Sequence, residues 1–177
     1  MPERKAVIFC SASFDIDDGF NDLARDVVRA LYGCGYGIVS GGTVKGTMKV
    51  VADEARRLGM EHTGIVPFFM KGVEYREATE LVWVDTMAER KVAMREGTSL
   101  AIALPGGIGT LDELMDTFTV AKLGRYGGKV IAFNFKGFYE PLKALLEHYV
   151  RTGMLDAPSL RLISFPETME DFLACIQ

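Results

Sequence analysis

The chain has 177 residues, 49% of them hydrophobic, and 20 lysines and arginines against 24 aspartates and glutamates give it a formal net charge of -4. This length can bury one sizeable core but is short for two, so we expect a single domain over residues 1–177. The acidic balance argues against nucleic acid as a partner, although a local pocket can still hold a small phosphorylated ligand.

Short β-prone runs alternate with segments of helical period, which is the pattern of a parallel sheet covered by helices. The predicted strands are, in chain order, Ala6–Cys10, Tyr36–Val39, Thr63–Val66, Leu81–Val84, Ser99–Leu104, Val130–Asn134 and Leu160–Ser164. Apolar residues at intervals of three and four predict helices at Phe20–Leu31, Met48–Leu58, Leu111–Ala121 and Phe138–Tyr149, and Pro166 is expected to start a last short helix. The predicted fold class is α/β, a single Rossmann-like domain with a doubly wound, mostly parallel sheet and helices on both faces.

The N-terminus and the cysteines favour a cytoplasmic protein. The apolar run after the charged first residues meets Asp15 too soon to be a signal peptide or a membrane span. The 3 cysteines are odd in number and widely spaced, which favours core thiols over a disulfide framework. Neither of the 2 histidines lies near a cysteine or the other histidine at ligand spacing, so we expect no metal site.

The loops that follow strands are where chemistry is expected, because ligands of doubly wound sheets lie beyond the carboxyl ends of the strands. Pro105-Gly106-Gly107-Ile108-Gly109-Thr110 follows one predicted strand and leads into the helix that begins near Leu111. Free backbone N–H groups and the positive end of the helix dipole would suit a phosphate there. Glycine would let the backbone approach the anion and adopt positive φ. The alternative is an ordinary glycine-rich turn.

A second glycine loop, Gly41–Thr47, follows the strand Tyr36–Val39 and would face the same crevice. Its spacing imitates the phosphate loop G-x-x-x-x-G-K-[ST], but Thr47 stands where the lysine should be, which removes the main support for nucleoside triphosphate hydrolysis. The sequence also lacks a G-x-G-x-x-G fingerprint, because Asp112 occupies the place of the third glycine. NAD and FAD are therefore not expected as cofactors.

The segment Thr86–Met94 is predicted to be a helix that starts with a capping box between Thr86 and Glu89. On a helical projection Lys91 falls on the apolar arc and Arg90 lies at its edge. Long cations on a buried face need anionic partners or a reason to lie near an anion. The alternative is that their stems run along the sheet edge while the charges reach solvent.

Two neighbouring segments resemble the paired signature of the Lonely Guy (LOG) family, an M-x-x-R-K element followed by P-G-G-x-G-T-x-x-E. They are Met87-Ala88-Glu89-Arg90-Lys91 and the stretch from Pro105 to Glu113. The similarity covers most of the chain, since Gly41-Gly42 and Gly46 correspond to the first glycine loop of the family. The resemblance implies a phosphoribohydrolase that cuts the N-glycosidic bond of a purine nucleoside 5′-monophosphate with water and no cofactor. It also implies a homodimer with the site near the subunit interface.

The resemblance implies roles for individual residues as well. Arg90 and Glu113 would be the catalytic pair. Glu113 would stabilise the cationic ribose carbon or take a proton from water, and Arg90 would anchor the phosphate or stabilise the departing base. The substrate- and phosphate-binding residues would be Gly41, Gly42, Lys91, Gly106, Gly107, Ile108, Gly109 and Thr110. The proton donor to the purine stays open.

Some positions depart from the family pattern, namely Ala88, Ser11-Ala12, Val120 and Lys122. We expect them to surround the nucleotide, so AMP and an N6-substituted adenine nucleotide are both open as substrates. Thr110-x-x-Glu113 is also spaced as a capping box, which would give Glu113 a structural role.

Two other functions and one assembly state follow from the same motifs. Binding of a nucleotide or cofactor without turnover is the alternative function, because the fold would serve a carrier equally well. Lysine decarboxylase, a label often given to the family, would require a pyridoxal phosphate lysine and a partner for the pyridinium nitrogen, which the sequence does not mark. The apolar stretch Pro67-Phe68-Phe69-Met70 favours a homodimer, since a monomer would leave it partly exposed.

Overall fold

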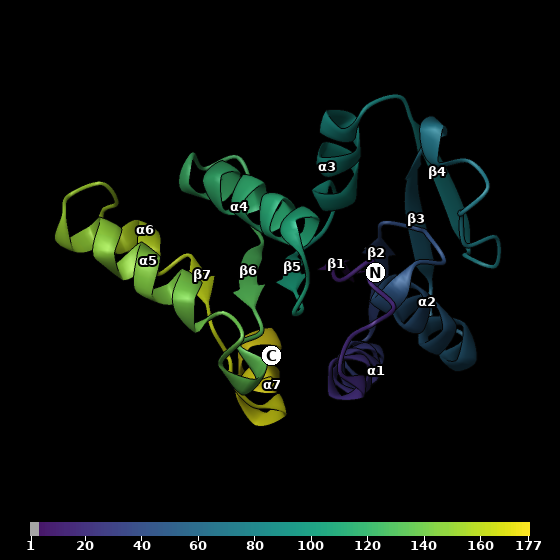
Figure 1. Ribbon diagram of the computed structural model, residues 1–177, viewed down its shortest axis with the longest axis horizontal. Coiled ribbons are helices and arrows are strands. Elements are labelled where there is room, and N and C mark those ends of the chain that lie inside the picture. Colours follow the sequence, from purple (N-terminus) through teal and green to yellow (C-terminus); the bar gives the residue numbers. More distant parts are fainter. Residues whose placement is uncertain (1–3) are drawn as a thin grey trace.

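The computed structural model describes residues 4–177, which form one seven-stranded sheet with helices on both faces (Figure 1). Its strands are β1 (Arg4–Phe9), β2 (Tyr36–Ser40), β3 (His62–Pro67), β4 (Glu80–Val84), β5 (Leu100–Ala103), β6 (Lys129–Ala132) and β7 (Ile163–Ser164). All neighbours are parallel, in the order β4-β3-β2-β1-β5-β6-β7. The chain builds outward from β1 to β4 and then places β5 on the other side of β1. The predicted doubly wound α/β sheet is confirmed.

Two layers of helices cover the sheet (Figure 1). One face carries α1 (Asp18–Gly33), α2 (Gly46–Leu58) and α7 (Met169–Ile176). The other carries α3 (Met87–Arg95), α4 (Ile108–Lys122), α5 (Glu140–Arg151) and the short α6 (Ala157–Leu160), while the 3-10 helices η1 (Phe68–Met70) and η2 (Phe135–Gly137) follow β3 and β6. Successive residues of a strand point to opposite faces. Ala6 and Ile8 of β1 therefore join the core with α1, and Val7 and Phe9 join the core with α4.

The strand order reverses between β1 and β5, which pair in register from Ala6 with Leu100 to Phe9 with Ala103. After β1 the chain turns to α1 on one face, and after β5 it turns to α4 on the other face (Figure 1). The two loops therefore diverge and leave a crevice at the carboxyl ends of the strands. The glycine loop after β2 reaches the same edge of the sheet.

The predicted strand Leu160–Ser164 is too long, because its first residue belongs to α6. Asp156 caps that helix, and its carboxylate accepts a hydrogen bond from the N–H of Ser159 (2.7 Å). Local capping therefore overrides the β-prone sequence until Ile163.

The last helix does not start at Pro166, so that prediction is wrong. The carbonyl of Pro166 accepts a hydrogen bond from the backbone N–H of Asn134 (2.7 Å), which keeps this segment extended beside the sheet. The helix begins only after Thr168, whose hydroxyl forms a capping box with Asp171.

Candidate active site

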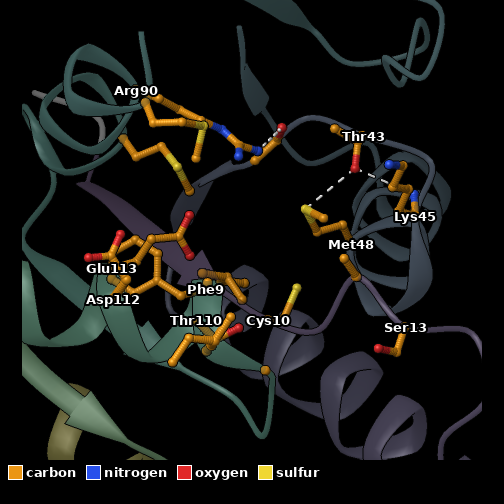
Figure 2. A pocket seen from close by; sticks show the side chains of 18 of the residues that line it. Phe9, Cys10, Ser13, Thr43, Lys45, Met48, Arg90, Thr110, Asp112 and Glu113 are labelled. Atoms are coloured by element: carbon orange, nitrogen blue, oxygen red, sulfur yellow. Dashed lines mark hydrogen bonds between the residues drawn. The ribbon is translucent and has the colours of Figure 1, made fainter. Parts of the chain in front are cut away.

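A cavity of about 400 Å³ opens at the carboxyl ends of the strands, beside the switch point between β1 and β5 (Figure 2). Its walls come from the loop after β1, the glycine loop after β2, η1, α3 and the first turns of α4. The predicted site residues that line it are Gly41, Arg90, Gly107, Ile108, Gly109, Thr110 and Glu113. The fold thus gathers residues from both halves of the sequence in one cavity.

The N-terminus of α4 forms one wall of the cavity. Gly107 is its N-cap residue, and no side chain of residues 4–177 caps this end of the helix. The N–H groups of Ile108, Gly109 and Thr110 have no partner within the helix because they belong to its first turn. A Cβ at Gly107 or Gly109 would meet no atom of the described chain within 4 Å. Both glycines therefore leave space in front of donors that suit an anion.

The conformational reason predicted for these glycines is wrong. Gly106, Gly107 and Gly109 do not adopt positive φ, which occurs in the other loop at Gly42 (66°) and Gly46 (52°). Gly106 is constrained by packing instead, since a Cβ there would collide with the side chain of Thr110. The loop before α4 needs small residues for access and packing rather than for a left-handed turn.

The side chain of Arg90 lies almost fully buried at one side of the cavity, with only 5% of the residue exposed. Its Nε donates to the carbonyl of Ile65 (3.1 Å), and its Nη2 donates to the carbonyl of Gly41 (2.7 Å). The predicted capping box of Thr86 and Glu89 is confirmed and fixes the start of α3. Burial lowers the pKa of Arg90, and the negative charge of Glu113 opposes this shift. Arg90 is therefore a desolvated cation held by neutral carbonyls.

Glu113 enters the cavity from the second turn of α4. Thr110 lies inside the first turn rather than at the N-cap, so the capping-box alternative for Glu113 is wrong. Burial raises the pKa of the Glu113 carboxyl to about 7; Arg90 lowers it, Asp112 raises it and Lys91 lowers it. A carboxyl with this pKa exchanges its proton near neutral pH, which suits general acid–base chemistry.

Arg90 and Glu113 approach the same cavity from two different helices, α3 and α4 (Figure 2). Two nearby groups stay neutral, because burial raises the pKa of the Cys10 thiol and of the Tyr139 phenol well above their usual ranges. The Tyr139 hydroxyl donates to the carbonyl of Leu104, just after β5 (2.7 Å). Within residues 4–177, the buried Arg90 and the half-buried Glu113 are therefore the groups of this cavity, apart from its exposed Lys45 and Asp112, that can carry charge near neutral pH.

Three predicted binding residues lie outside this cavity. Gly42 packs on β3, and a Cβ there would lie 2.8 Å from the Cα of Gly64. Gly106 lines a smaller adjoining cavity of about 180 Å³. Lys91 does not line the cavity, and its Nζ lies 3.1 Å from Oδ1 of Asp112.

The departures from the family signature do not all surround the cavity, contrary to our expectation. Ala12 lines the cavity and Ser11 lines the adjoining one. Ala88 lies in a shallow groove between β4 and α3 instead. Val120 and Lys122 lie in the last turn of α4, away from the cavity end of that helix.

Several residues that line the cavity were not predicted from the sequence, namely Cys10, Thr43, Lys45, Met48, Met70, Met87, Met94 and Asp112. The position of Cys10 at the end of a predicted strand could have identified it, because strand ends meet at the switch point. Met70 carries no such signal, since it reaches the cavity through the packing of η1. The methionines give the cavity a largely apolar wall that can adapt its shape.

Fold and site together define a Rossmann-like α/β protein with a ligand-sized cavity and, within residues 4–177, an uncapped helix N-terminus that suits an anion. Residues 48–176 match the family described as possible lysine decarboxylase. Over 174 residues the chain is 34% identical to the cytokinin riboside 5′-monophosphate phosphoribohydrolase of Mycobacterium tuberculosis, covering 95% of this chain and 91% of that protein. It is 30% identical to the Arabidopsis thaliana protein of the same activity named LOG2, covering 90% and 76% of the two chains. The chain therefore belongs to the LOG family, as its motifs predicted.

Solved structures support the same fold at low sequence identity. The molybdenum cofactor carrier protein of Chlamydomonas reinhardtii superposes with a TM-score of 0.75 at 14% identity, covering 98% of this chain and 96% of that chain. The molybdenum cofactor binding protein of Rippkaea orientalis gives a TM-score of 0.74 at 15% identity, covering 98% and 95%. Sequence identities this low show a shared fold and carry no statement about ligands.

None of the helices in residues 4–177 is long and apolar enough to cross a membrane. The same residues contain no group of three or more histidine, cysteine, aspartate or glutamate side chains arranged to hold a metal ion.

We predict that Glu113→Gln makes the protein sensitive to mild acid. Burial lowers the pKa of His62 to about 4, so its stabilising contribution is lost as the pH falls below the unfolded value of 6.5. The raised pKa of Glu113 has the opposite effect on stability. The free energy of unfolding rises as the pH falls below about 7, because protonation removes the unfavourable desolvation of the carboxylate. The two effects should offset each other in the wild type between pH 7 and about 4.5, and Glu113→Gln removes one of them.

The free energy of unfolding, measured in urea at several pH values, should fall by roughly 2 kcal/mol between pH 6.5 and 4.5 in Glu113→Gln. The wild type and Glu147→Gln, which changes an exposed residue of α5, should vary much less over this range. A flat profile for Glu113→Gln would contradict the prediction.

Proposed function

We propose that this protein hydrolyses the N-glycosidic bond of a purine nucleoside 5′-monophosphate, releasing the free base and ribose 5-phosphate. The observation that carries the proposal is the convergence of Arg90, Glu113 and the uncapped N-terminus of α4 on one cavity. Curated relatives named cytokinin riboside 5′-monophosphate phosphoribohydrolase support this reaction class. A nucleotide substrate also fits the cytoplasmic location that the sequence predicts.

The phosphate is best accommodated at the N-terminus of α4. Gly107, Gly109 and the intervening Ile108 offer backbone N–H groups, and the helix dipole adds positive potential there. Arg90 adds a permanent cation within the same cavity. The side chain of Thr110 packs against Gly106, in the space that a Cβ of Gly106 would occupy.

Glu113 is the proposed base of the reaction. Water attacks the ribose carbon and the C–N bond breaks, with its electron pair passing to the purine nitrogen. The Glu113 carboxylate accepts the proton of the attacking water and offsets the positive charge that develops on the ribose carbon. Its pKa of about 7 matches this task near neutral pH. Arg90 stabilises negative charge on the phosphate or on the departing base.

The base would lie against the apolar part of the cavity. Met48, Met70, Met87 and Met94 contribute flexible side chains there, and the hydroxyl of Thr43 lies 3.5 Å from the sulfur of Met48. Such a wall accommodates adenine or an apolar substituent on its N6 atom. The names of the relatives favour the N6-substituted nucleotide.

The decarboxylase label of the family receives no support from the lysine of the M-x-x-R-K motif. A pyridoxal phosphate Schiff base would require a free amine that faces the cofactor. The Lys91 amine is engaged instead by the carboxylates of Asp112 and Asp116. We therefore assign this lysine no covalent role.

A homodimer is part of the proposal. Phe68 and Phe69 of η1 are 54% and 66% exposed, and Val92 of α3 is 50% exposed. Phe68 stacks on Trp83 of the edge strand β4, with ring centroids 5.5 Å apart. Trp83 and Val92 line the groove between β4 and α3 that also contains Ala88. A second copy would remove this apolar surface from water.

The substrate prediction is that AMP is hydrolysed with a kcat/KM roughly 100-fold or more above that of adenosine. Loss of the phosphate removes binding energy that orients the ribose, so both turnover and affinity should fall. Chromatography of the products from matched nucleotide and nucleoside pairs, N6-substituted pairs included, measures this ratio. Equal kcat/KM values for AMP and adenosine would contradict the phosphate site, and a bound but intact nucleotide would favour a binding protein.

Glu113→Gln should lower kcat by about 100-fold or more while the affinity for AMP stays near that of the wild type. Glutamine preserves the size of the side chain but cannot accept a proton or offset a cation. Turnover by quenched product analysis and affinity by calorimetry separate the two effects, with Glu147→Gln as the control. Wild-type turnover in Glu113→Gln would remove this residue from the mechanism.

Light scattering at micromolar concentration should report a mass near twice the 19.5 kDa of one chain. Val92→Glu should shift the protein toward the monomer, because it places a charge on the apolar surface of α3. Leu145→Glu, at a comparably exposed position of α5, is the matched control and should leave the dimer intact. A wild-type mass near that of one chain would argue against the dimer.

A further inference from the structure

α3 and α4 each carry one member of the proposed catalytic pair directly beside one member of a surface ion pair. Lys91 follows Arg90 on α3, and Asp112 precedes Glu113 on α4. The Nζ of Lys91 lies 3.1 Å from Oδ1 of Asp112 and 3.6 Å from Oδ1 of Asp116. The ion pair therefore links the two helices at the residues adjacent to Arg90 and Glu113.

A second link lies one helical turn further along α3. Arg95 pairs with the carboxylate of Asp116, and its Nη1 also donates to the carbonyl of Lys91 (3.3 Å). The side chains of Lys91 and Arg95 are only 21% and 14% exposed. Partial burial reduces the screening of these charges by solvent. Two half-buried cations of α3 thus face two acidic residues of α4.

We propose that the ion pair between Lys91 and Asp112 holds α3 against α4 and places two opposite charges that balance each other at the Glu113 carboxyl. Both residues are then positioning residues for the reaction, and Lys91 is not a phosphate ligand. This inference rests on the proposed function, in which Glu113 is the base.

The electrostatic part follows from the charges around Glu113. The ionisable groups that face it are Arg90 and Lys91 on α3, Asp112 on α4, Cys10 after β1 and Tyr139 before α5. Burial of the carboxyl has the largest effect on its pKa. Arg90 lowers that pKa, Asp112 raises it and Lys91 lowers it. Because Asp112 and Lys91 shift the pKa of Glu113 in opposite directions, removing one charge leaves the shift caused by the other charge uncompensated.

The test is a titration of the Glu113 carboxyl by NMR in protein labelled with ¹³C at the glutamate carboxyls, with Glu113→Gln identifying the resonance. Asp112→Asn should lower the pKa of Glu113, and Lys91→Met should raise it, each by roughly 0.2–0.7 pH units. The double variant should return close to the wild-type value, because both charges are then absent.

A matched control uses the surface ion pair of Arg25 and Asp22 on α1, whose charges are not among those that shift Glu113. Asp22→Asn and Arg25→Met should leave the Glu113 titration unchanged. Shifts no larger than in these controls, or shifts in the same direction for Asp112→Asn and Lys91→Met, would overturn the inference.

Kinetics provides an independent measurement. The acid limb of the kcat profile with AMP should move with the NMR pKa in each variant, while a change only in KM for AMP would indicate a direct contact of Lys91 with the phosphate and overturn the inference. The titration requires no turnover. If the wild type hydrolyses none of the nucleotides tested, the proposed function fails, and the titration still decides whether the charges of Lys91 and Asp112 balance each other at Glu113.

Discussion

The burial of the Arg90 guanidinium against two backbone carbonyls is the interaction on which the rest of the site depends. A buried cation is costly unless its donors are satisfied, and here the carbonyls of Gly41 and Ile65 satisfy two of them. These carbonyls belong to the loop after β2 and to β3, so one side chain fixes α3 against two neighbouring strands. A Cβ at Gly41 would collide with the guanidinium, which explains why this position is glycine. The same contact orients the helix that carries Lys91.

The glycine loop after β2 is also stabilised by buried polar contacts of Ser40. Ser40 Oγ accepts a hydrogen bond from the N–H of Gly42 (3.1 Å) and lies 2.7 Å from Nε2 of His62. His62 is 2% exposed, and burial lowers its pKa, so the ring is neutral near pH 7. Gly42 meanwhile approaches the backbone of Gly64 too closely for a side chain. The loop that meets Arg90 therefore rests on neutral, tightly packed supports.

The fold was predictable because periodicity reports which side of each element is buried. Seven short apolar runs separated by helical periods leave few arrangements other than a doubly wound sheet, and the switch point then locates the cavity. The glycine motif around Gly107 predicted that a helix begins there. The capping role of Glu113 was excluded only by the structure, because α4 begins at Ile108 and Thr110 is therefore not the N-cap residue. Spacing along one helix could not predict the partner of Lys91, since Asp112 lies on another helix and the pairing depends on how the helices pack. For the same reason the sequence could not predict that Met70 lines the cavity.

Two glutamates, Glu54 and Glu113, have pKa values shifted in opposite directions, and the difference separates a structural carboxylate from a proposed catalytic one. Glu54 is 6% exposed, and hydrogen bonds from Arg57 and Arg29 lower its pKa to about 2. It is a paired carboxylate that pins α2 to α1. The Glu113 carboxyl forms no such bonds with residues 4–177, and burial raises its pKa to about 7 although Arg90 shares the cavity. Folding alone would favour pairing both carboxylates. An unpaired carboxyl beside a buried cation raises the free energy of the folded state, and a site keeps such a group where a ligand or a proton will meet it.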